Sequence, residues 1–141
     1  MAMVISTLRI LTAPQSRAEV VRTLAAQLGP IRVQPGCLRC DLYQDVEDQG
    51  AITLVEEWRS QAELDLRLRS EDYRAVLAAI EMAQEQPVIH FDTVTRRGGL
   101  EIVASAREFP HGACSLPGLG LESGRAAQAG PGRACCQLPI G

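Results

Sequence analysis

Two stretches in the first half of the chain alternate apolar and polar residues, and this pattern limits the fold more than any other feature. They are residues 35–45 and residues 51–60. Strict alternation is typical of a β-strand whose two faces meet different surroundings. The five residues between them are acidic and end in Gly50, as a hairpin connection often does. The sequence therefore predicts a β-hairpin.

The residues before the hairpin predict one more strand and a helix. Residues 4–11 alternate in the same way and predict a first strand. Ser16 and Glu19 then have the spacing of a capping box, which starts a helix. Apolar residues recur at helical spacing from there. Pro30 lacks a backbone donor, so we expect Gly29-Pro30 to end or kink this helix.

The residues after the hairpin predict the second half of the fold. Ser60 and Glu63 form another capping box, and residues 70–72 resemble a fresh cap before a helix that Pro87 ends. Residues 88–95 alternate again and predict a fourth strand. This order of elements is that of a ferredoxin-like α+β sandwich, in which helices cover one face of an antiparallel sheet.

The second face of this sheet is expected to carry more apolar side chains than a solvent-exposed surface tolerates. A second copy packed sheet to sheet would cover it, so the sequence predicts a homodimer. The residues expected on this face are Ile5, Thr7, Tyr43, Thr53, Val55, Ile89, Phe91 and Thr93.

The composition changes near the C-terminal end. Residues 100–106 are mostly apolar and could form a fifth strand that reaches a partner subunit. Residues 108–141 hold seven of the 12 Gly, four of the 8 Pro and three of the 5 Cys. Such a segment has little apolar surface to offset the entropy of ordering. We therefore divide the chain into a folded domain, residues 1–107, and an irregular tail, residues 108–141.

Charge and composition argue against several partners. A net charge of -3 gives no basic surface for nucleic acid. No apolar run is long enough to cross a membrane, and the first residues do not resemble a secretion signal, so we expect a cytoplasmic protein. Five Cys residues without a compact spacing favour reduced thiols over a disulfide framework.

The chain resembles the antibiotic biosynthesis monooxygenase (ABM) domain family over about residues 3–97. The hairpin and the helix start after it carry this resemblance. Members carry a similar Gly-Cys-Leu…Asp-Leu strand, here residues 36–42, and a similar Glu-x-Trp strand end, here residues 56–58. The resemblance implies a dimeric α+β barrel with a pocket between sheet and helices. It also implies that O₂ oxidises a small electron-rich aromatic, such as a quinol, without a metal, flavin or haem cofactor.

Glu56 and Trp58 share the strand face that we assign to the helices. A carboxylate among apolar neighbours must be hydrogen-bonded or have a shifted pKa. Glu56 is therefore either a catalytic base that takes the substrate proton or the partner of an Arg. Trp58 either stacks on the substrate or fills the core. Tyr73 is expected to form a second wall of the substrate site.

Two positions depart from the family pattern. Quinol-oxidising relatives often have His nine residues after the Trp and again just after the following Ser, where this chain has Arg67 and Asp72. Arg67 could stabilise a substrate anion, although it cannot act as a base near neutral pH, or it could be solvated at a helix end. His90 is the domain's remaining imidazole and is either a substrate-binding or a structural residue.

Other chemistries are less favoured. Cys37 and Cys40 are three apart on a predicted strand and should point to opposite faces, so we expect no metal site there. Haem-degrading relatives use an Asn, and this chain has none. Two functions remain: a cofactor-independent monooxygenase acting on a phenolic or quinol substrate, or a non-catalytic dimeric α+β barrel that binds a small metabolite or serves in assembly.

Overall fold

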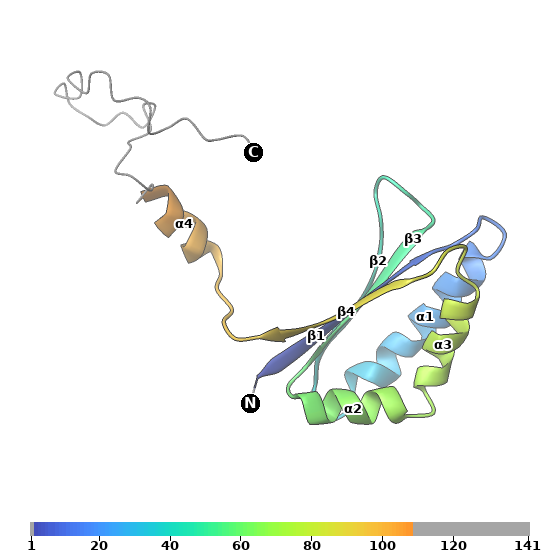
Figure 1. Cartoon of the computed structure of the whole chain (residues 1–141), viewed down its shortest axis with the longest axis horizontal. Helices are drawn as coiled ribbons and strands as arrows, with labels where there is room; N and C mark the ends of the chain where they lie inside the picture. Colours follow the sequence, from blue (N-terminus) through green and yellow to red (C-terminus); the bar gives the residue numbers. More distant parts are fainter. Residues whose placement is uncertain (1, 109–141) are drawn as a thin grey trace, which may run out of the picture. The chain divides into compact units, whose positions relative to one another are not determined.

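The computed structural model of the chain describes residues 2–108 (Figure 1). The chain divides into two units, residues 1–96 and residues 97–141. The elements are β1 (Met3–Leu11), α1 (Arg17–Arg32), β2 (Cys37–Gln44), β3 (Ala51–Trp58), α2 (Gln61–Arg69), α3 (Tyr73–Glu81), β4 (Val88–Val94) and α4 (Leu100–Glu108). The first unit holds β1 to β4, and α4 belongs to the second.

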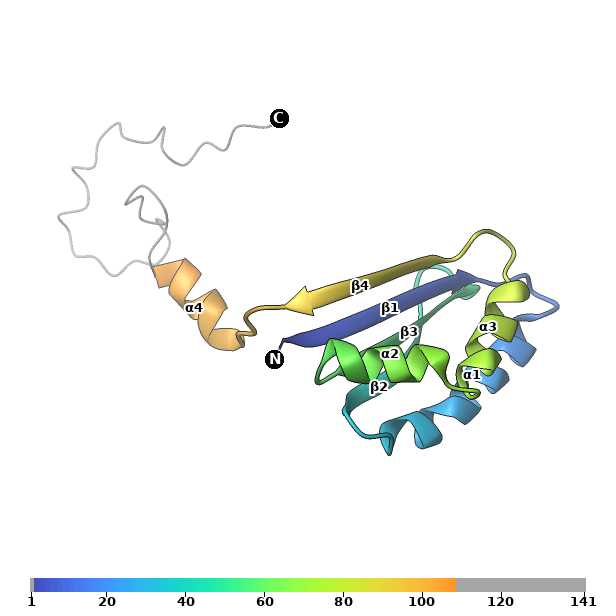
Figure 2. The same ribbon diagram turned by 60° about the horizontal axis from the view of Figure 1, so that its bottom comes forward.

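The first unit is the predicted ferredoxin-like α+β fold. Its four strands form one antiparallel sheet in the order β2-β3-β1-β4. Helices α1, α2 and α3 all lie on one face of this sheet (Figure 2). The core lies between the two layers and includes Val4, Leu8, Ile10, Val20, Leu24, Ile31, Ile52, Leu54, Trp58, Leu64 and Val76.

The predicted faces are right for β1, for β3 and for Tyr43 of β2, but wrong for β4. Ile89, Phe91 and Thr93 pair with Leu8, Ser6 and Val4 of β1, all on the helix face. His90 is therefore on the open face, the face away from the helices. Ile89 and Phe91 remain 39% and 46% exposed because β4 lies at the sheet edge. With both faces exposed, burial does not select one in the sequence.

The open face is more polar than predicted. Tyr43, Thr53 and Val55 do lie there, together with charged residues of the same strands. Arg39 contacts Glu57 across the strands, with its Nη1 3.5 Å from a Glu57 carboxylate oxygen. The homodimer stays a prediction, and the apolar face offered for it is smaller than the sequence suggested.

Helix α1 continues past Gly29 and Pro30 to Arg32, so this pair does not end the helix, and the alternative of a kink stays a prediction. Tertiary contacts explain the two extra residues. Ile31 is fully buried in the core, and Arg32 Nε–H donates a 2.9 Å hydrogen bond to the Cys40 carbonyl.

The two predicted capping boxes behave differently. Ser60 Oγ accepts a 3.3 Å hydrogen bond from the Glu63 backbone N–H at the start of α2. Ser16 makes no side-chain cap bond at the start of α1, and its hydroxyl instead donates to the Ala13 carbonyl at 3.3 Å. The same sequence pattern thus satisfies the helix donors in only one of the two places.

This difference leads to a prediction about the free energy of unfolding. We expect Ser60→Ala to lower the free energy of unfolding by about 1 kcal/mol, because an amide of the first turn loses its acceptor. The matched change Ser16→Ala should cost less than about 0.5 kcal/mol, since no cap bond is lost. Urea unfolding of the two variants measures both values. Equal losses would contradict the assignment.

In the second unit, residues 100–106 lie in a helix, and the predicted fifth strand is wrong. Glu101 lies in the first turn of α4, where a negative charge stabilises a helix. Its carboxylate accepts a 2.7 Å hydrogen bond from the Gly99 N–H, which lowers the pKa of Glu101. The predicted tail lies outside the described residues except for Glu108, and the boundary after residue 107 stays a prediction.

Candidate functional site

Glu56, Trp58 and Arg67 form a hydrogen-bonded group between the sheet and α2. The Trp58 indole N–H donates to Glu56 Oε2 at 3.0 Å. Arg67 donates to the same carboxylate twice, from Nε to Oε2 at 3.3 Å and from Nη2 to Oε1 at 3.1 Å. Glu56 therefore accepts three hydrogen bonds, and the predicted pairing with an Arg is confirmed.

This group is deeply buried. Glu56 is 3% exposed, and Trp58 and Arg67 are each 1% exposed. The alternative of a solvated Arg67 at a helix end is therefore wrong. Burial of an ion pair is costly unless its hydrogen bonds are satisfied, and the two-point contact between Arg67 and Glu56 supplies most of them.

The fold positions each member of the group. Alternation on β3 places Glu56 and Trp58 on the helix face. Arg67 is on the same side of α2 as Leu64 and Leu68, three residues after one and one before the other, so it faces the core with them. Tyr73 is the first residue of α3, and its ring centroid lies 5.0 Å from the Arg67 guanidinium carbon.

One guanidinium nitrogen of Arg67 has no acceptor among the residues that the structure describes. An arginine carries five N–H donors, and the two toward Glu56 leave one on Nη2 and both on Nη1. Arg67 Nη1 is buried and has no hydrogen-bond partner among residues 2–108. A buried donor without a partner is uncommon and costs free energy, so it points to a ligand atom that would accept from it.

The neighbouring ionisable groups are held in their neutral forms. Burial, and then the Glu56 charge, raise the pKa of Tyr73 and of Cys37. The same two causes raise the pKa of the Cys40 thiol from 9.0 to about 12. These shifts mean that Glu56 and Arg67 supply the local charges.

Cys37 and Cys40 lie on the same face of β2, and the prediction that they point to opposite faces is wrong. A register shift between Cys37 and Arg39 inserts one extra residue into β2. Cys37 therefore pairs with Trp58 and Cys40 with Glu56, both on the helix face. Both thiols are free. No group of three potential metal ligands occurs among residues 2–108.

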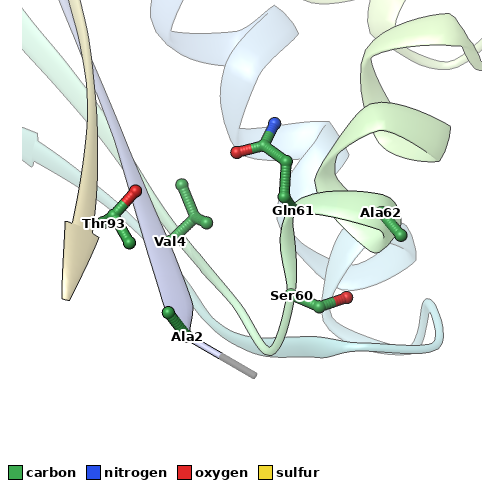
Figure 3. A pocket seen from close by; sticks show the side chains of 6 residues that line it. All are labelled: Ala2, Val4, Ser60, Gln61, Ala62 and Thr93. Atoms are coloured by element: carbon green, nitrogen blue, oxygen red, sulfur yellow. The ribbon is translucent and has the colours of Figure 1, made fainter. Parts of the chain in front are cut away.

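A pocket of about 290 Å³ opens between the sheet and the start of α2 (Figure 3). In Figure 3, Val4 and Thr93 lie on the sheet side, and the start of α2 forms the opposite side. The residues that line it are Ala2, Val4, Ser60, Gln61, Ala62 and Thr93.

None of the five predicted site residues lines the pocket. Of these five, Trp58 is paired directly with a residue that lines the pocket, because Val4 of β1 lies opposite Trp58 of β3. Glu56 is two residues further along β3, or roughly 7 Å. The structure thus brings Glu56, Arg67, Trp58 and Tyr73 together but leaves His90 on the open face.

Sequence reasoning missed Phe91 and the pocket residues. Phe91 pairs with Ser6, which pairs with Glu56, so all three lie in one row across the helix face. The register between β1 and β4 would have identified Phe91, but alternation alone does not determine register. Gln61 and Thr93 carry no sequence signal that we can identify.

Comparisons with known proteins agree with this architecture. The family described as "Antibiotic biosynthesis monooxygenase" matches residues 1–79. The protein named "Putative monooxygenase Rv0793", from Mycobacterium tuberculosis, is 31% identical over 80 residues, which cover 57% of this chain and 78% of the relative.

Solved structures give the same result for the fold. The structure of Rv0793 matches with a TM-score of 0.63 at 23% identity, covering 69% of this chain and 99% of that one. PA3566 from Pseudomonas aeruginosa matches with a TM-score of 0.59 at 26% identity, covering 70% of this chain and 97% of that one. Within residues 2–108, no helix has both the length and the apolar character to span a membrane.

Proposed function

The chain belongs to the antibiotic biosynthesis monooxygenase family, and from this we propose that it oxidises a small phenolic or quinol-type aromatic with O₂, without a cofactor. A deprotonated phenol or hydroquinone can pass an electron to O₂ by itself. The protein then has to exclude water, orient the ring and stabilise the anion. In an anthrone-type substrate, the ring CH₂ becomes a carbonyl and the second oxygen atom leaves as water.

The observation that carries the proposal is Arg67 Nη1, which is buried without a hydrogen-bond partner among residues 2–108. A phenolate oxygen placed there would accept a charge-assisted hydrogen bond in a site closed to water. Hydrogen bonds to charged groups contribute about 1.5–3 kcal/mol, which lowers a phenol pKa by roughly one to two units. That brings an ordinary phenol closer to ionisation at neutral pH.

We assign Glu56 one of two roles, positioning of Arg67 or general base, which an experiment distinguishes. Its contacts with Arg67 and Trp58 support a positioning role, because they fix the guanidinium in one orientation. The role of general base would require one carboxylate oxygen to be released toward the substrate. Trp58 and Tyr73 would form the walls around the ring, and the pocket at Val4 and Thr93 would be the entrance.

The second candidate is a binding module without turnover. It is favoured by the closed state of the group, in which Glu56 and Arg67 are almost inaccessible. It is also favoured by Arg67 and Asp72, which stand where quinol-oxidising relatives often have His. His90 as a ligand contact, the homodimer and a cytoplasmic location stay predictions.

Oxygen uptake by the purified, metal-free protein tests the proposal. Across a panel of hydroquinones and anthrones, we expect saturable O₂ consumption above the spontaneous rate, with an oxygenated product detected by mass spectrometry. Glu56→Gln separates the two tasks, since loss of a base changes the pH profile and loss of positioning does not. Ligand-induced thermal stabilisation without O₂ uptake would favour the binding module instead.

A further inference from the structure

The bulge in β2 brings two thiols to the same side of the sheet. Cys37 lies opposite Trp58 and Cys40 opposite Glu56, and these two residues of β3 are neighbours on the helix face. On a regular strand, positions three apart would point to opposite faces. The register shift between Cys37 and Arg39 adds one residue, so both thiols of the Cys-x-x-Cys motif lie on the helix face.

The spacing of the two residues suits a bridging metal better than a disulfide. Trp58 and Glu56 are two residues apart on β3, so the Cα atoms of Cys37 and Cys40 opposite them are roughly 7 Å apart. A disulfide needs Cα atoms within about 6.8 Å and Cβ atoms about 3.8 Å apart. A metal between two sulfurs allows them to be up to about 4.6 Å apart, which is twice a metal–sulfur bond of about 2.3 Å. Two side chains on one face reach that separation when their Cβ–Sγ bonds lean toward each other.

One thiol of this pair is accessible and the other is enclosed. Both are free, and Cys40 is 1% exposed whereas Cys37 is partly exposed. The Cys37 S–H donates to the Arg39 carbonyl at 3.7 Å, a weak contact that a metal ion can replace. An ion can therefore reach Cys37 from solvent and be enclosed by binding Cys40.

The number and type of the ligands select the metal. Zn²⁺ sites in proteins use four protein ligands, or three and a water molecule. Among residues 2–108, no group of three His, Cys, Asp or Glu side chains could hold a metal ion. Cu(I) is a soft ion that prefers thiolate ligands, and it is stable with two of them in a linear arrangement.

The charges around the pair partly offset the charge of such a complex. When Cu(I) replaces both thiol protons, the protons pass to solvent and the complex carries one negative charge. Arg67 and Arg32 favour the ionised thiols, whereas burial and Glu56 oppose them. Arg32 Nε–H donates to the Cys40 carbonyl at 2.9 Å, which holds its positive charge beside the pair, although its Nη2 also contacts Asp41.

We propose that Cys37 and Cys40 bind one Cu(I) ion between their sulfur atoms, on the helix face of β2. The two thiols, their common face and the lack of a third ligand in the described part of the chain carry this proposal. It goes beyond the proposed reaction and does not depend on it.

Anaerobic titration with Cu(I) in competition with a chromogenic Cu(I) chelator tests the site. The full-length parent carries Cys114→Ser, Cys135→Ser and Cys136→Ser, so that Cys37 and Cys40 are its remaining thiols. We expect one Cu(I) per chain. Cys37→Ser, at a partly exposed position, and Cys40→Ala, which keeps a small apolar side chain in the core, should each lower the affinity at least about 100-fold, more than loss of an outer-shell partner usually costs. An equal concentration of Zn²⁺ should not displace the Cu(I).

Alkylation by N-ethylmaleimide locates the ion independently. In the metal-free parent, Cys37 should react faster than the buried Cys40, and one equivalent of Cu(I) should protect both, as peptide mass spectrometry measures. The proposal is overturned if the parent loses its Cu(I) to the chelator as readily as Cys37→Ser does. It is also overturned if Cu(I) binds and leaves Cys37 open to alkylation.

Discussion

Arg67→Met is expected to lower the free energy of unfolding by about 3–5 kcal/mol, the largest effect of any single substitution that we predict. The change removes the cation and leaves the Glu56 carboxylate buried at 3% exposure with Trp58 as its remaining described partner. Breaking a buried ion pair in this way is far more costly than never having one. Urea unfolding followed by Trp58 fluorescence measures the loss.

The double variant Glu56→Gln/Arg67→Met identifies the cause. It removes both charges and keeps an oxygen that can accept from the Trp58 indole, so most of the lost stability should return. Arg69→Met, an exposed neighbour on the same helix, should change the free energy of unfolding by less than about 0.5 kcal/mol. A double variant as unstable as Arg67→Met would show that the guanidinium contributes through packing rather than charge.

Alternation predicted the faces of β1 and β3 because one face of each strand is buried and the other is not. Val4, Leu8 and Leu54 therefore separate clearly from Thr7 and its open-face neighbours. On β4 the same reasoning failed, because an edge strand exposed on both sides imposes no such selection. Whether alternation identifies the buried face of a strand therefore depends on the position of that strand in the sheet. The periodicity of the sequence does not reveal this position.

Part of the candidate site could be predicted from spacing. Glu56 and Trp58 follow from strand alternation, and the inward position of Arg67 follows from its helical spacing to Leu64 and Leu68. That Arg67 Nη1 has no partner within the described part of the chain could not be predicted, since this depends on the placement of α2 over the sheet. The bulge that turns Cys37 to the helix face also leaves no recognisable pattern.

Helix termini show the same limit. Ser16 and Ser60 have identical capping-box spacing, yet the Ser60 hydroxyl alone of the two caps its helix. The local sequence makes a capping hydrogen bond possible. Whether the side chain forms it depends on the backbone path of the preceding residues. The helix α4 in place of a predicted strand has a related cause, because a short apolar run fits either period.

The second large effect concerns the proposed reaction. In Glu56→Gln/Arg67→Met, the site keeps Trp58, Tyr73 and the pocket but has lost the cation that would hold the phenolate. Removing a charged hydrogen bond worth about 1.5–3 kcal/mol predicts a 10- to 150-fold loss in the rate of O₂ uptake, normalised to the folded fraction. Glu56→Gln alone, which keeps Arg67, should lose less if Glu56 only positions the guanidinium.

A chromogenic phenol that does not react with O₂, such as 4-nitrophenol, separates anion stabilisation from turnover. Bound to the parent protein, it should ionise about one to two pH units below its value in water, because Arg67 Nη1 donates to the phenolate and not to the neutral phenol. In the double variant this shift should disappear while weak binding of the neutral form continues. An unchanged shift would place the anion elsewhere and leave Arg67 as a purely structural cation.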